Sequence, residues 1–97
     1  MNLIYHRGVQ RDVSEVLTYY DQAGGSGLGD AFFAELMSQV QIARKQPTAF
    51  HFFEGELRRA NLSRFPYHFL FRNTGNTVRI LVVRHNRRHP DYGIRRR

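Results

Sequence analysis

The chain has 97 residues, of which 41% are hydrophobic and 13% aromatic, carries a formal net charge of +7 and contains no cysteine. This length allows one domain with a single core, the aromatic content argues against a disordered basic tail, and the lack of cysteine excludes disulfides and thiolate chemistry. The apolar run before His6 is far too short for a signal-peptide core or a membrane span, so we expect one soluble, cytoplasmic domain over residues 1–97 with no membrane contact.

The first half of the chain is typical of a strand followed by a helix. The segment "LIYH", which ends at His6, is a short β-favouring run before Gly8. Asp12 and Glu15 then have the form of a capping box at the start of a helix, and Gly24-Gly25 should end it. The apolar face of this helix is formed by residues at helical spacing: Val13, Val16, Leu17 and Tyr20.

A second helix is predicted to begin between Ser26 and Gly29 and to end before Pro47. We expect Leu36 and Val40 in the core. Because only a short Gly-rich loop separates the two helices, they should form an antiparallel hairpin. The "GGSGLGD" segment is interpreted as this turn and not as a phosphate loop, since it lacks the Lys-Ser/Thr pair. The apolar positions of the second helix are Phe33, Leu36, Met37, Val40 and Ala43.

After Pro47 the pattern changes from helical to alternating. An aromatic connection, "TAFHFFEGE", leads into a strand in "LRRANLSRF", with Ala60 and Leu62 on one side. Two further strands, "YHFLFRN" and "NTVRILVVRHN", are separated by Thr74-Gly75 and should pair as an antiparallel hairpin. The run "ILVV" predicts an interior strand, with helices on one face and partial cover on the other. The order β-α-α-β-β-β predicts an α+β fold, with a helical hairpin packed on a small, mainly antiparallel sheet.

The positive charge is concentrated in the second half of the chain. Residues 1–57 hold four Lys or Arg and seven Asp or Glu, a net charge of −3, whereas residues 58–97 hold eleven Arg and only Asp91, a net charge of +10. All but one of the basic residues are arginine, whose planar fork of donors suits phosphate and carboxylate oxygens. This asymmetry predicts an anionic partner, either nucleic acid or an acidic protein segment.

The segments "LRRANLSRFPYHFLFR" and "VRILVVRHNRRHPDY", with the hairpin turn between them, resemble the RelE/ParE superfamily of toxins from bacterial type II toxin–antitoxin systems. The order of elements and the Tyr19-Tyr20 pair match as well, so the resemblance extends over nearly the whole chain. "RFPYHFLFR" and "VVRHNRRHPDY" are more similar to the ParE-like, plasmid-stabilisation branch than to RelE itself. The resemblance implies a small cytoplasmic toxin that arrests growth and is neutralised by a cognate antitoxin in an oligomeric complex. Members of the superfamily act either by poisoning DNA gyrase or by cutting mRNA on the ribosome.

If the protein is a metal-independent mRNA endonuclease, it needs a base, an acid and positive charge near the phosphate. The resemblance and the chemistry of the side chains together point to four catalytic candidates: His85, Tyr92, Arg64 and Arg88. Arginines expected to bind nucleic acid or another target are Arg58, Arg59, Arg84 and Arg87. No cofactor is expected, and no metal site, because His85 and His89 lack a third ligand at sensible spacing.

Other polar residues have simpler interpretations. His68 lies in a hydrophobic strand and is expected to be a packed sheet residue. His89-Pro90 is typical of a turn. The terminal "IRRR" is expected to be a solvated charge run first and a phosphate contact second.

Three functions from different classes agree with these observations. The first is a ParE-like toxin that binds gyrase and needs no acid or base of its own. The second is a ribosome-dependent mRNA endonuclease of RelE type, and the third is a basic nucleic-acid-binding module that is not a toxin. The first is slightly preferred, because where RNA-cutting relatives carry a lysine pair this chain has Arg58 and Arg59 at best. In the toxin hypotheses the antitoxin is expected to bring an acidic segment to the helices and the Arg-bearing sheet.

Overall fold

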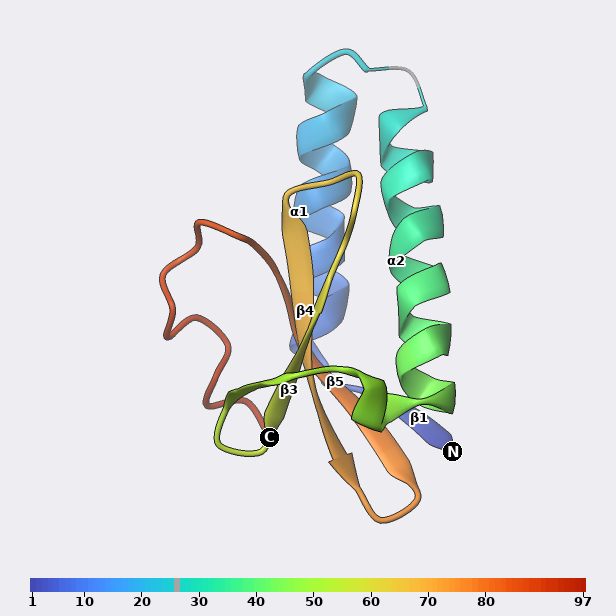
Figure 1. Ribbon diagram of the computed structural model, residues 1–97. Helices are drawn as coiled ribbons and strands as arrows, with labels where there is room; N and C mark the ends of the chain where they lie inside the picture. The colour runs from blue at the N-terminus through green and yellow to red at the C-terminus, as the bar shows by residue number, and fades with distance from the viewer. Residues whose placement is uncertain (26) are drawn as a thin grey trace.

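The structure is a computed structural model that describes residues 1–25 and 27–97. Figure 1 shows two helices lying side by side next to a small twisted sheet, and a C-terminal segment that loops away from the end of the last strand. The elements follow in the order β1 (Asn2–Tyr5), α1 (Gly8–Gln22), α2 (Leu28–Lys45), the 3-10 helix η1 (Pro47–Ala49), β2 (Phe52–Glu54), β3 (Leu57–Asn61), β4 (Tyr67–Thr74) and β5 (Thr77–His85).

One five-stranded sheet holds these strands in the order β1-β5-β4-β3-β2. β1 is parallel to β5, and the other neighbours are antiparallel. The predicted α+β fold is confirmed, and so is the interior position of the "ILVV" strand, because β5 lies between β1 and β4. The one addition is β2, inside the predicted aromatic connection. It forms because Gly55, at a φ of +52°, lets the chain turn back onto β3.

The predicted hairpin between the last two strands is confirmed. Thr74 and Thr77 face each other at the end of the β4–β5 ladder, and Gly75 has a φ of +58°, which glycine adopts without strain. Further along β5 the register shifts at a bulge, and both Leu81 and Val82 belong to the apolar cluster on the face away from the helices. This bulge explains why the strand is apolar without interruption.

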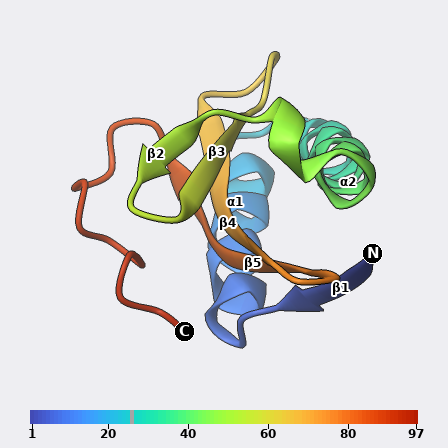
Figure 2. The same cartoon turned by 60° about the horizontal axis from the view of Figure 1, so that its bottom comes forward.

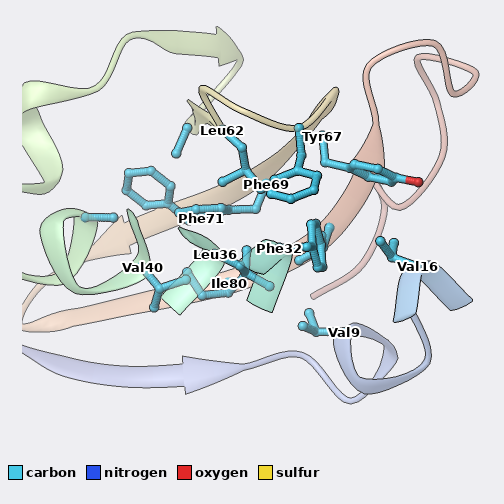
Figure 3. Packing of buried hydrophobic residues seen from close by; sticks show 14 of the residues in the cluster. Val9, Val16, Phe32, Leu36, Val40, Leu62, Tyr67, Phe69, Phe71 and Ile80 are labelled. Carbon is cyan, nitrogen blue, oxygen red and sulfur yellow. The ribbon is translucent and has the colours of Figure 1, made fainter. Parts of the chain in front are cut away.

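The main core lies between the helices and one face of the sheet (Figure 3). Leu36 and Val40 are 1% and 0% exposed, as predicted. The predicted helix face is wrong at one position, since Phe33 is 43% exposed and its neighbour Phe32 is fully buried. Both phenylalanines fit the helical period, so tertiary contacts decide between them. The rings that pack against Phe32 belong to Tyr20, Phe65 and Tyr67.

α1 begins one turn earlier than predicted. It starts at Gly8, whose N–H donates to the Nδ1 of His6 at 2.9 Å, and Arg7 before it makes no side-chain cap. The predicted capping box of Asp12 and Glu15 is therefore wrong. Asp12 lies in the second turn of the helix, where it is buried and 4% exposed.

The remaining helix boundaries agree with the sequence. α1 ends ahead of Gly24, and α2 begins at Leu28 and ends before Pro47. Ser26, which belongs to the predicted start of the second helix, lies outside the described residues. Within residues 1–25 and 27–97, neither helix has the length and apolar character needed to cross a membrane.

The C-terminal segment, residues 86–97, runs on the side of the sheet away from α2 (Figure 2). Tyr92 and Ile94 pack against an apolar cluster on this face, which confirms the predicted partial cover. Gly93 makes the close approach possible, because it has a φ of +77° and a Cβ there would lie 2.5 Å from a methyl carbon of Val82. The cluster consists of Leu57, Leu70, Leu81 and Val82, with Phe53 at its side.

Candidate functional site

A recess of about 200 Å³ lies between α1, the end of β5 and the C-terminal segment. It brings together three of the four catalytic candidates, His85, Arg88 and Tyr92. Arg64 is not among the lining residues. It lies outside the sheet, in the exposed loop between β3 and β4, with its guanidinium 5.4 Å from the ring centroid of Phe65. The other lining residues are Asp12, Glu15, Val16, Tyr19, Tyr67, Val83 and Arg84.

The carboxylate of Asp12 is a buried charged group of the recess. It accepts hydrogen bonds from the Tyr92 hydroxyl at 3.1 Å and from the Val83 N–H at 3.1 Å. It also accepts two from Arg96, at 2.6 and 3.1 Å. This bidentate pair raises the pKa of the Arg96 guanidinium. With four donors around it, Asp12 joins α1 to β5 and to the C-terminal segment.

The position of this network follows from the unequal lengths of β1 and β5. β1 pairs with β5 only as far as Ile80, so no strand covers the edge of β5 beyond that point. There the Val83 N–H donates to Asp12, and the Leu81 carbonyl accepts from Arg96 at 3.1 Å. Buried backbone groups need such partners. Two side chains from distant parts of the chain thus replace the missing ladder.

Arg84 holds the C-terminal segment from inside. Its side chain is buried, and its Nη1 donates to the carbonyls of His89, Pro90 and Tyr92 at 3.3, 2.7 and 3.0 Å. Its Nε donates to the Nε2 of His68 at 2.9 Å. Burial lowers the pKa of Arg84, although an arginine remains charged at neutral pH. These bonds occupy the guanidinium within the chain, which disfavours the expected contact of Arg84 with a target.

His68 is 1% exposed, as expected of a packed sheet residue. Because its Nε2 accepts the bond from Arg84, the Nδ1 of the neutral ring carries the proton and donates to the Oδ1 of Asn86 at 2.8 Å. Burial lowers the pKa of His68 from 6.5 to about 4. A protonated ring would lose the bond from Arg84 and face its positive charge, so His68 belongs to the support of the C-terminal segment.

We expect the free energy of unfolding to decrease as the pH falls from 6.5 to about 4. In this window His68 takes up a proton in the unfolded chain but not in the folded one, so acid favours unfolding by at most about 3 kcal/mol. Urea titrations of the wild type and His68→Gln over this range would measure the effect. Glutamine keeps an acceptor for Arg84 and a donor for Asn86 but does not titrate, so the variant should lose less stability in acid. Equal slopes for the two proteins would contradict the prediction.

His85 and Arg88 are two of the accessible polar residues that line the recess. The Nδ1 of His85 accepts the N–H of Arg87 at 3.0 Å, so the neutral ring has its proton on Nε2. The ring packs edge-on against Tyr67, with centroids 5.0 Å apart. Arg88 is exposed. One imidazole N–H and one guanidinium are therefore placed to meet a ligand.

Tyr92 is held differently. Its ring lies under the guanidinium of Arg88, 3.8 Å from centroid to Cζ. Its hydroxyl donates to Asp12 and accepts a bond from Arg96 at 3.3 Å. Transfer of the hydroxyl proton to a ligand would break this buried network, which favours a structural role for Tyr92.

The arginines expected to bind a target do not gather on one surface. Arg58 and Arg59 are consecutive on β3 and so point to opposite faces of the sheet. The guanidinium of Arg58 lies 3.9 Å from the ring centroid of Phe52, and Arg59 donates to Asn61 at 2.7 Å. Arg87 is exposed in the turn after β5. A single binding patch that includes all four arginines is therefore disfavoured.

A second, mainly apolar groove of about 520 Å³ lies beside α1, α2 and the end of β1, and we call it the helix groove. Phe33 and Tyr5 are 43% and 41% exposed in it, and the Tyr5 hydroxyl lies 4.0 Å from the sulfur of Met37. Exposed aromatic side chains in a groove are typical of protein interaction sites. The lining residues are Tyr5, His6, Arg7, Val9, Gln10, Val13, Ser14, Phe33 and Met37.

The pairing of Asp12 with Arg96 was not predicted from the sequence. Asp12 was assigned to a helix cap and Arg96 to a solvated run, and both assignments are wrong, because their side chains are 2% and 18% exposed. One signal was present in the sequence. Asp12 occupies the same helix face as Val9 and Val16, three and four positions away, and a carboxylate on an apolar face needs a buried partner. The predicted turn at His89-Pro90 is confirmed, since the Nδ1 of His89 accepts a hydrogen bond from the Asp91 N–H in a turn.

Comparison with solved structures finds the same fold in a chain described as "Chromosomal ParDE TA system from P. aeruginosa". The TM-score is 0.77, the sequence identity is 19%, and the match covers 88% of this chain and 95% of that one. No protein-family model matches the sequence, and no curated protein matches it either. The likeness shows a shared fold, which is the fold that the RelE/ParE resemblance predicted. Among the described residues, no group of three or more His, Cys, Asp or Glu is placed to hold a metal ion.

Proposed function

We propose that this protein is the toxin of a type II toxin–antitoxin system and that it acts as ParE-like toxins do, by binding DNA gyrase. The fold shared with a ParDE chain supports the first part. The second part depends on one observation, the engagement of the Tyr92 hydroxyl by Asp12 and Arg96. A toxin that acts by binding alone needs no side chain free for proton transfer.

RNA cleavage would need more than the predicted catalytic candidates supply in the recess. The reaction requires a base for the 2′-hydroxyl, an acid for the leaving oxygen and positive charge at the phosphate. His85 is one candidate for proton transfer, while Tyr92 is bonded within the chain and Arg64 is not among the lining residues. The candidate set is thus incomplete in the recess, and this favours the binding mechanism.

The alternative, an mRNA endonuclease of RelE type, is favoured by a different observation. His85 and Arg88 line the same recess, and they carry an imidazole N–H and a guanidinium. These two groups would donate one proton and stabilise one phosphate. In this mechanism His85 is indispensable, which makes it the residue that separates the two proposals.

The proposed partner is a cognate antitoxin, and the helix groove is the surface we assign to it. The groove is mainly apolar, and Phe33 and Tyr5 are too exposed for side chains that serve only the core. An amphipathic segment of the antitoxin would cover them, as helices do in other grooves of this kind. The charge of residues 58–97 favours an acidic segment elsewhere in the same partner.

Expression of the chain alone in bacteria tests the proposed function. We expect growth arrest with filamentation and a DNA damage response before translation declines. His85→Ala and Tyr92→Phe should both retain this arrest, because neither side chain performs proton transfer in the proposed mechanism. Microscopy, a DNA damage reporter and the rate of amino-acid incorporation after induction measure the order of events.

The same experiment distinguishes the alternative. Early loss of translation with cleaved mRNA, abolished by His85→Ala, would overturn the gyrase proposal in favour of the nuclease. Thermal unfolding of the purified variants is the control, since Tyr92→Phe removes two bonds of a buried network. No growth arrest from the folded wild type would contradict a toxin of either kind.

A further inference from the structure

Two arginines that belong to none of the sites above face each other across the β4–β5 ladder. Arg72 and Arg79 are directly opposite in the register of this antiparallel pair, so their side chains lie on the same face of the sheet. Leu57, which pairs with Arg72, belongs to the apolar cluster on the face away from the helices. The two arginines therefore share that face, and we call them the arginine pair.

The arginine pair is unfavourable in the protein by itself. Like charges directly opposite on neighbouring strands repel. Within the described residues, neither side chain takes part in a hydrogen bond or an ion pair, and the Nε of Arg79 is buried without an acceptor. The nearest acid along the row is Glu54, which pairs with Leu57 and is thus separated from Arg72 by a strand. A buried donor without a partner costs free energy, and an external carboxylate bound to the accessible part of the two guanidiniums would relieve the repulsion between them.

The neighbours of the arginine pair indicate which anion fits. Ile4 pairs with Arg79 on the other side and is 43% exposed, which places an apolar side chain at the end of the row. The next row towards the hairpin turn contains Thr74, Thr77 and Asn2, which bear no charge. A nucleic-acid backbone would leave Ile4 uncovered, and the row has no aromatic ring for a base to stack on. A peptide with carboxylates next to an apolar residue matches both features.

We propose that Arg72 and Arg79 form a binding site for the carboxylates of an acidic peptide segment of a partner protein, with Ile4 contacting an apolar residue of the same segment. The site rests on the proposed function and deepens it, because it gives the acidic segment that we expect in the partner a defined place on Arg72 and Arg79; binding of a peptide there can be measured whether or not the chain is toxic. Both arginines are half-buried residues with a positively charged, forked guanidinium, which suits bidentate binding of a carboxylate. Binding would remove the repulsion between them and raise the stability of the folded chain.

The test uses a short fluorescein-labelled peptide of alternating Glu and Leu, its Gln/Leu counterpart, and a single-stranded RNA oligonucleotide of similar length. Fluorescence anisotropy with the full chain should show binding of the acidic peptide and not of the Gln/Leu peptide. Arg72→Gln/Arg79→Gln should weaken this binding by at least about tenfold. The control Arg11→Gln/Lys45→Gln removes the same charge from the helices and should stay within about twofold of wild type at moderate salt. Arg72→Lys/Arg79→Lys should fall between wild type and the Gln variant, because lysine keeps the charge without the fork.

Thermal unfolding without ligand gives an independent measurement. Arg72→Gln/Arg79→Gln should unfold at the same temperature as wild type or higher, because the substitution removes a repulsion. A clear decrease would mean that the arginines stabilise the fold and would overturn the proposal. If Arg11→Gln/Lys45→Gln weakened binding of the acidic peptide as much as Arg72→Gln/Arg79→Gln, the effect would come from net charge alone, and the proposal would be overturned as well. Stronger binding of the RNA through the same two arginines would replace the peptide by nucleic acid.

Discussion

Replacing Asp12 by Asn is expected to lower the free energy of unfolding by about 3–5 kcal/mol, the range seen when one partner of a buried ion pair is removed. All four bonds to this carboxylate come from donors. In either orientation an amide would turn its N–H groups towards two of them and leave the charge of Arg96 uncompensated. Urea denaturation of the purified variant at neutral pH measures the loss.

Glu15→Gln is the matched control for this substitution. It removes the same charge from the same helix, but Glu15 pairs with Arg11 at 3.4 Å on the surface, with side chains 54% and 85% exposed. Its effect should be at most about 0.5 kcal/mol. Asp12→Leu combined with Arg96→Met removes the unpaired charge but should recover only part of the loss, because the Val83 N–H and the Leu81 carbonyl remain without their partners. A cost below about 1 kcal/mol for Asp12→Asn would contradict the role assigned to Asp12.

Replacing Arg84 by Met is the second large change. Methionine retains much of the buried volume but donates no hydrogen bond, so three carbonyls of the C-terminal segment and the Nε2 of His68 lose their donor. We expect a loss of about 2–3 kcal/mol, because buried acceptors without partners are costly. Hydrogen exchange should show where the loss occurs. The amides of Tyr92 and Ile94, bonded to His89 and Asp91, should exchange faster, while those in the centre of β4 keep their protection.

Arg87→Met, three positions further along the chain, controls for the change of charge and residue type. Arg87 is exposed in the turn after β5, so its substitution should change stability by no more than about 0.5 kcal/mol. Uniform loss of protection across the sheet in Arg84→Met would show that Arg84 supports the whole fold. Unchanged exchange in residues 88–96 would contradict its role in holding the C-terminal segment.

Much of the fold followed from local patterns in the sequence. The hairpin turn at Gly75, the end of α1 before Gly24 and the end of α2 before Pro47 depend on backbone preferences of glycine and proline, which act over a few residues. The burial of Leu36 and Val40 followed from helical spacing. Period alone does not distinguish Phe32 from Phe33, because either fits the same stripe, and the packing of the rings around Phe32 made the choice.

The candidate site was predicted only in part. Proximity along the chain was enough to place His85, Arg88 and Tyr92 in one region, and they do line one recess. The Tyr92 side chain, however, is held by a hydrogen bond to a residue that is remote in sequence. Asp12, which engages the Tyr92 hydroxyl, is 80 positions away, and no local pattern links them.

The sequence by itself determined the α+β architecture, the antiparallel hairpin and the uneven distribution of charge, because these depend on spacing, turn residues and composition. The tertiary structure decided how the charges are used. It paired Arg96 with Asp12 at the edge of β5 that β1 leaves uncovered, and it enclosed Arg84 with His68 of the neighbouring strand β4. The physical reason is that burial makes a charge depend on its partner, and partners meet only when distant segments pack.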